Sequence, residues 1–174
     1  MRRGTGGFSL VELLIVMVII AVVAAIGMAG WRNAKVRGNE ASALASLTAI
    51  NHAQFAYAQT CGHGRFAPTL LALKAPAPAT DHGFLEPDLA REEPVTKSGY
   101  MFVYGGTEDP DLKVSCSGVA GVLTYRVTAD PLTPNVTGMR FFGTNKDRII
   151  YSDSVTYTGN MPETGAPAHG SEIK

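Results

Sequence analysis

The sequence predicts an α+β protein in which a long N-terminal α-helix, transmembrane in its first half, packs on a small antiparallel β-sheet. Three observations support this prediction. Residues 8–28 are almost entirely apolar, and residues 31–58 lack proline and repeat apolar side chains at helical spacing. Farther along, short segments rich in aromatic and β-branched residues are separated by turn-forming residues. We therefore expect one apolar helix joined to one loop-rich soluble domain.

The apolar helix follows a short basic leader, residues 1–7, which contains Arg2 and Arg3. As a helix, residues 8–28 would span roughly 31 Å, which matches the hydrocarbon core of a bilayer. A secretory signal peptide is the competing interpretation, because several small residues at the end of the apolar run could form its cleavage site. Its apolar region would be shorter, at ~7–15 residues.

Glu12 is the only charged residue in the apolar run. A carboxylate near the centre of a membrane helix costs ~2.5–3.5 kcal/mol, and somewhat less towards the interface. Two interpretations remain open. Either Glu12 lies near the headgroups, where it extends to the polar layer or takes up a proton, or it has a cationic partner in an assembled protein.

The segment Gly7-Phe8-Ser9-Leu10-Val11-Glu12, with its basic leader and apolar run, resembles the type III signal of type IV pilins and type II secretion pseudopilins. The resemblance covers about the first 30 residues. It implies that a prepilin peptidase cuts between Gly7 and Phe8, and that Phe8 becomes the N-methylated mature terminus. It also implies that Glu12 pairs with the Phe8 amine of a neighbouring subunit during filament assembly.

This family commonly carries a helix-bending proline near the end of the apolar run, where this chain has Ala29. Gly27 and Gly30 flank that position and loosen a helix less sharply than proline does. The numbers of basic residues on the two sides of the span are nearly equal, so charge does not decide the orientation of the span in the membrane. The resemblance implies a single-pass bacterial inner-membrane protein with a cytoplasmic N-terminus and a periplasmic head. From there it would enter an extracellular or periplasmic filament through an inner-membrane assembly platform.

We expect five segments along the chain. They are a leader (1–7), a transmembrane and assembly helix (8–30), a periplasmic half of the same helix (31–60), a globular α+β head (61–158) and a flexible tail (159–174). In the second half of the helix an apolar stripe predicts the face that packs on the sheet, formed by Ala43, Leu47, Ile50 and Tyr57. Gln54 lies inside this stripe and Phe55 outside it. The helix is expected to end near 60–64, where glycines interrupt it.

A proline-rich connection, residues 65–99, precedes the sheet and contains one expected helical turn at 70–73. Four strands are predicted, at 100–104, 123–129, 139–143 and 148–152. Residues 144–147 are predicted to form the hairpin turn between the last two. In the second strand Leu123, Tyr125 and Val127 are expected on one face.

Cys61 and Cys116 are the only cysteines. In an exported domain they predict a disulfide, worth roughly 4 kcal/mol in the chain-entropy model, with free thiols or a metal pair as alternatives. A zinc site with His63 would lack a fourth ligand. Some pseudopilins bind calcium through a C-terminal loop, but here Asp147 and Asp153 are the nearest acidic residues, and a turn residue and a strand-end cap explain them better. We expect no metal and no cofactor.

Charge and motifs limit the functions that this sequence can be expected to have. The formal net charge is zero, with 15 basic and 15 acidic residues, which gives no support for nucleic-acid binding. The four histidines lack a nucleophile or second carboxylate at an informative spacing, so we expect no enzyme. We expect a structural subunit of a type IV pilus or pilus-like filament, a homo-oligomer. The alternatives are a type II secretion pseudopilin, which forms a periplasmic piston, and a single-pass membrane-anchored binding domain that does not polymerise.

Overall fold

The structure is a computed structural model that describes residues 8–76 and 81–173, and only the backbone of residues 26–29. The chain divides into two compact units between Lys35 and Val36. One helix, α1 (Leu10–Thr60), contributes to both units. The second unit, which we call the head, therefore begins inside the segment 31–60 that the sequence assigns to the second half of the helix.

The end of α1 lies where the glycines predict it. Gly62 donates its backbone N–H to the Tyr57 carbonyl (2.7 Å), and Gly64 donates to the Ala58 carbonyl (2.9 Å). Gly64 has a φ of +84°, a left-handed conformation that glycine adopts at little cost. These bonds satisfy carbonyls of the last helical turn, which have no partner within the helix.

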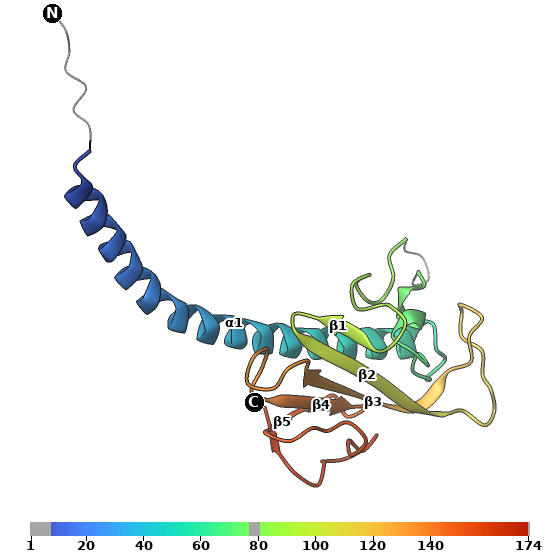
Figure 1. The fold of residues 1–174 in the computed structure, drawn as a ribbon. Helices are drawn as coiled ribbons and strands as arrows, with labels where there is room; N and C mark the ends of the chain where they lie inside the picture. The colour runs from blue at the N-terminus through green and yellow to red at the C-terminus, as the bar shows by residue number, and fades with distance from the viewer. Residues whose placement is uncertain (1–7, 77–80, 174) are drawn as a thin grey trace, which may run out of the picture. The chain divides into compact units, whose positions relative to one another are not determined.

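Six strands form one antiparallel sheet in which neighbours in sequence are neighbours in space (Figure 1). The strands are β1 (Val95–Lys97), β2 (Tyr100–Glu108), β3 (Val122–Pro131), β4 (Phe141–Asn145), β5 (Ile150–Asp153) and β6 (Ser171–Glu172). A short 3-10 helix, η1 (Leu71–Lys74), lies in the connection before them, one residue later than the predicted turn. The predicted α+β class, a long helix on a small antiparallel sheet, is confirmed.

Three details of the sheet differ from the prediction. The edge strands β1 and β6 have three and two residues, too few for a sequence pattern to indicate them. The third predicted strand lies two residues later than expected, because Thr144 and Asn145 still pair with β3. The predicted turn at 144–147 therefore begins only after Asn145, and it contains Arg148 at a φ of +64°.

Leu123 does not lie on the core face with Tyr125 and Val127. The pairing of β2 with β3 shifts between Thr107 and Glu108, so that Thr107 pairs with Thr124 and Glu108 with Val122. Leu123 is the extra residue of this β-bulge, and it is 38% exposed. A bulge changes the side to which the following side chains point, which breaks the simple alternation of the sequence.

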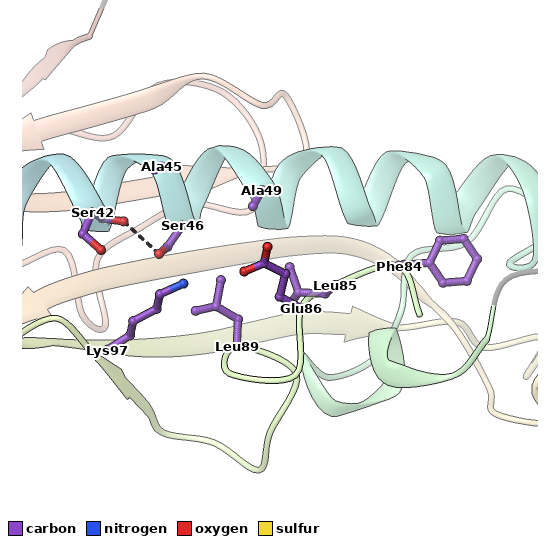
Figure 2. A pocket seen from close by; sticks show the side chains of 9 residues that line it. All are labelled: Ser42, Ala45, Ser46, Ala49, Phe84, Leu85, Glu86, Leu89 and Lys97. Carbon is purple, nitrogen blue, oxygen red and sulfur yellow. Dashed lines mark hydrogen bonds between the residues drawn. The ribbon is translucent and has the colours of Figure 1, made fainter. Parts of the chain in front are cut away.

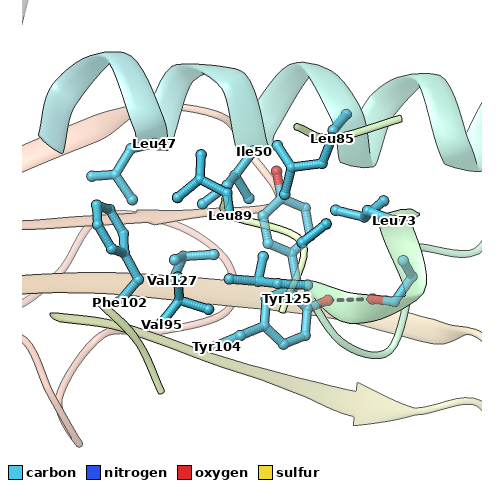
Figure 3. Packing of buried hydrophobic residues seen from close by; sticks show 14 of the residues in the cluster. Leu47, Ile50, Leu73, Leu85, Leu89, Val95, Phe102, Tyr104, Tyr125 and Val127 are labelled. Carbon is cyan, nitrogen blue, oxygen red and sulfur yellow. Dashed lines mark hydrogen bonds between the residues drawn. The ribbon is translucent and has the colours of Figure 1, made fainter. Parts of the chain in front are cut away.

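The core lies between the head portion of α1 and one face of the sheet (Figure 3). The predicted helix stripe is buried there, together with Phe102 of β2 and Tyr125 and Val127 of β3. Leu73, Leu85 and Leu89 of the long connection close the same cluster. Burying a side chain of this size contributes ~1.5–3 kcal/mol, so the stripe holds the helix on the sheet.

Two buried amides fix how α1 sits on the sheet. The Gln54 amide donates to the Tyr104 hydroxyl of β2 (3.1 Å) and to the Ala67 carbonyl (3.2 Å), and it accepts from the Ala67 N–H (2.8 Å), which explains a glutamine inside the apolar stripe. One turn earlier, the Asn51 amide donates to Thr144 Oγ1 (2.9 Å) and accepts from the Tyr125 hydroxyl (2.9 Å). Because an unpaired buried amide is costly, these bonds favour one register of helix on sheet.

The segment after residue 158, expected to be a flexible tail, is bound to the sheet in the structure. Its strand β6 pairs with β5, and Met161 is buried beside Tyr157 in a small cluster on the face of the sheet away from α1. Asn145 donates its amide to the carbonyls of Pro162 (3.1 Å) and Gly165 (2.8 Å). The glycine- and proline-rich composition of this segment gives no sign of these partners, which lie far away in sequence.

Three carboxylates hold this segment, and each has a lowered pKa. The N–H of Gly165 lowers the pKa of Asp147, and the hydrogen bond from His169 lowers that of Asp153. Burial raises the pKa of Glu163, but hydrogen bonds from Thr124 and Thr107 and the Arg126 charge outweigh burial, and the net shift is downward.

We expect acid to loosen the C-terminal segment before the central strands. A carboxyl group whose pKa is lower in the folded state stabilises the fold above its unfolded pKa, about 3.9 for Asp and 4.3 for Glu, and this stabilisation is lost as the pH falls through the folded pKa. Hydrogen exchange, corrected for its intrinsic pH dependence, should show residues 159–173 losing protection below about pH 4. Equal protection of this segment and of β3 at every pH would contradict the expectation.

Candidate functional site

The described first part of α1 is apolar around its whole circumference. Every described side chain from Leu10 to Ala25 is exposed, and the most apolar 18-residue window has a mean hydropathy of 3.0. By length and composition this helix could cross a membrane. Along one side, a shallow groove is lined by residues at helical spacing, namely Leu10, Leu13, Leu14, Met17, Val18 and Ala21. A helix of this kind is stable only where lipid or other helices surround it.

Glu12 caps the start of this helix. Its Oε2 accepts the backbone N–H of Ser9 (3.1 Å), and Leu13 donates its own N–H to the Ser9 carbonyl (3.3 Å). A glutamate three residues after a serine at the helix start is one half of a capping box, which satisfies a backbone donor that has no partner within the helix. The spacing Ser-x-x-Glu before the apolar run is the local sequence signal for this cap.

The capping bond leaves the carboxylate able to act outside its own chain. The bond uses Oε2, and the structure describes no hydrogen bond to Oε1 within residues 8–76 and 81–173. Phe8, the predicted methylation site, precedes the helix and is 81% exposed. Gly7, on the other side of the predicted cleavage point, lies outside the described residues. α1 is continuous through Ala29, the position at which the resemblance leads one to expect proline.

The two cysteines meet at the far end of α1. Cys61 and Cys116 form a disulfide, the pairing that the sequence predicts, and the Cys116 N–H also donates to the Cys61 carbonyl (2.9 Å). This bond removes the thiolates that a zinc ion would need. Within the described residues, no three His, Cys, Asp or Glu side chains gather in a way that could hold a metal ion.

The histidines and the acidic candidates of the head have structural surroundings. His169 Nδ1 lies 2.7 Å from Asp153 Oδ2, and its ring stacks on Tyr157 at 5.0 Å between centroids. Asp147 accepts from the Gly165 N–H (2.6 Å). His52, His63 and His82 are exposed. Asp147 and Asp153 therefore fasten the C-terminal segment, in addition to the turn and strand-end roles that the sequence predicts.

A groove of about 290 Å³ lies between α1 and the connection that precedes the sheet (Figure 2). Its hydroxyl groups are engaged inside the fold, because Ser46 donates to the Ser42 carbonyl (2.8 Å) and the Ser42 hydroxyl donates to Ser98 (2.8 Å). Its cation, Lys97, pairs with Asp88 (2.7 Å). Glu86 also lines the groove, and its carboxylate is the one charged group there for which the described residues show no ion pair. A single such group does not form a converging set of polar groups for a ligand.

Comparison with known proteins bears on the N-terminal segment. A family model described as the prokaryotic N-terminal methylation motif matches residues 2–28. No curated protein and no solved structure matched the chain. The chain carries this prepilin-type motif, which is typical of type IV pilins and pseudopilins, and its fold is the α+β fold of a pilin-like protein. Both findings point to a structural protein anchored by its apolar N-terminal helix.

Proposed function

We propose that this protein is a structural subunit of a type IV pilus or pilus-like filament. The observation that carries the proposal is the arrangement of the N-terminus. Phe8 lies just before α1, Glu12 lies in its first turn, and the apolar side chains that follow are exposed on every side of the helix. Lipid covers such a helix before assembly, and neighbouring helices cover it afterwards. In lipid, association depends on close packing and polar pairing, so small residues such as Ala21 and the one carboxylate favour a helical bundle.

Processing creates the cationic partner of the proposed polar contact, and Glu12 is the anionic one. A prepilin peptidase cuts between Gly7 and Phe8, which creates an amine on Phe8, and methylation leaves that amine basic. The Glu12 carboxylate of one subunit then pairs with the Phe8 amine of another, which neutralises two charges in an apolar surrounding. The inner-membrane assembly platform takes up subunits whose heads are on the periplasmic side and adds them to the growing homo-oligomer, an extracellular or periplasmic filament.

The experiment that tests this proposal is mass spectrometry of the mature N-terminus, for which we expect N-methylated Phe8. A membrane-anchored domain that never polymerises has no need of this modification.

A further inference from the structure

Two loops of the head carry most of its exposed large apolar side chains. Of the ten such side chains from Val36 onward among the described residues, six lie in two loops. The 109–121 loop joins β2 to β3 and exposes Leu112, Val114 and Val119. The 132–140 loop joins β3 to β4 and exposes Leu132, Val136 and Met139. Single exposed apolar residues are ordinary, but two groups of three suggest contact surfaces.

The 132–140 loop is fixed to the start of the head portion of α1. Asn39 donates its side-chain amide to the Thr137 carbonyl (2.8 Å), and Glu40 Oε1 accepts the Met139 N–H (2.9 Å). Gly138 packs so closely on Tyr100 that a Cβ there would overlap the ring. Leu132 and Val136 are each 50% exposed and Met139 63%. The loop thus exposes apolar side chains while hydrogen bonds to α1 hold its backbone in place.

The 109–121 loop is fixed to the other end of α1. The disulfide joins its Cys116 to Cys61, and Arg65 pairs with Asp109 at 2.6 Å. Leu112 has a φ of +48°, a left-handed conformation that is strained for leucine, and its side chain is 62% exposed. Such strain persists only where the surroundings enforce it. This loop too is held in a shape that keeps an apolar side chain in solvent.

The two surfaces lie at opposite ends of the head and differ in charge. Their anchors are Glu40 on α1 and Cys61 directly after the end of α1, about 30 Å apart along the helix axis. Figure 1 shows the 109–121 loop projecting beyond the end of α1, while the loop between β3 and β4 lies near the other end of the sheet. Glu108, Asp111 and Lys113 are exposed at the 109–121 loop, where acidic groups thus outnumber the basic one, and Arg37 is exposed two residues before Asn39.

We propose that the 132–140 loop of one copy binds the 109–121 loop of the next copy along the filament. The proposal rests on the proposed function and specifies which surfaces of the heads meet. Because the two surfaces are different and lie at opposite ends, their contact is heterologous and can repeat without closing, as a filament requires. The occupant is a second copy because one chain carries both apolar surfaces, one with an excess of acidic groups around it and the other with Arg37 beside it.

The small size of the contact explains why it would act only in an assembly. Three side chains on each partner bury far less than the ~1,200–2,000 Å² of a stable protein pair. Once the α1 helices have bundled, the heads are held at high effective concentration, and a weak contact then adds to assembly. We therefore expect the contact in filaments and not between free subunits.

The test uses the full chain in cells that assemble it. Met139→Glu and Leu112→Glu should each reduce the recovered filament about tenfold, because each places a charge in an apolar contact. The matched control is Leu71→Glu, which changes a leucine that is 40% exposed on η1, in neither loop, and should assemble as the wild type does. Filament yields equal to the wild type for both loop variants would overturn the proposal.

Cross-linking identifies the partner. A photo-reactive residue at position 136 should form, in filaments, a product joined to residues 109–121 of another copy, and the same group at position 71 should not. Products joined to lipid, or to other segments only, would overturn the contact while leaving the filament intact. If the unaltered chain forms no filaments, the proposed function fails, and the two failures are thus distinguishable.

Discussion

Replacing Glu12 with alanine should leave membrane insertion intact and reduce filament assembly by at least about 100-fold. Removing one member of a charge pair in an apolar surrounding leaves the other charge uncompensated, and such losses are among the largest that single substitutions cause. Insertion should be unaffected, because the change makes the helix more apolar. The measurement is the ratio of sheared filament protein to membrane-bound subunit.

The capping bond to Ser9 calls for a second variant. Glu12→Gln keeps an oxygen that can accept the Ser9 N–H, since glutamine also serves in capping boxes, but it removes the charge. We expect Glu12→Gln to fail in assembly almost as severely as Glu12→Ala. Normal filaments from the glutamine variant would show that the carboxylate serves its own helix and not a neighbouring amine.

Loss of the disulfide should give the largest change in the stability of the head. Cys61 and Cys116 are 55 residues apart, and opening a loop of this length costs about 4 kcal/mol in the chain-entropy model. That is a large share of the 5–15 kcal/mol by which a typical domain is stable. The double serine variant carries Cys61→Ser and Cys116→Ser. Urea unfolding of the full chain in detergent, monitored by far-UV circular dichroism, should show a lower midpoint for this variant than for the unaltered protein.

Reductant provides the matched control for this prediction. Adding it to the unaltered protein should reproduce the loss, and adding it to the double serine variant should change nothing. Complete thiol labelling of the folded protein without reductant would show that the two cysteines are not joined.

The sequence predicts the parts of this fold that periodic patterns encode. Leu47, Ile50 and Tyr57 recur at helical spacing and are all buried, and the helix ends at the expected glycines. The pattern could not account for Gln54, whose partner Ala67 is brought close only by the fold. Leu123 lies off the predicted core face because a bulge interrupts the alternation, and the alternating pattern of the sequence does not reveal the bulge.

The C-terminal segment shows a second limit. Its composition is typical of a mobile tail, yet Glu163 pairs with Arg126 (2.9 Å) and Gly165 binds Asp147. These are contacts between residues far apart in sequence, and no local propensity reports them. The candidate site is easier to predict from the sequence, because Phe8 and Glu12 belong to one local motif. The capping role of Glu12 was equally local, in the spacing from Ser9.

The most direct test of the proposed function is the mass of the N-terminal peptide of the chain isolated from its native membrane or filament. Processing by a prepilin peptidase predicts a peptide that begins at Phe8 and carries one N-methyl group. A peptide that begins at Met1, or one that begins beyond Ala25 as a secretory signal cleavage would produce, would contradict a filament subunit of this kind.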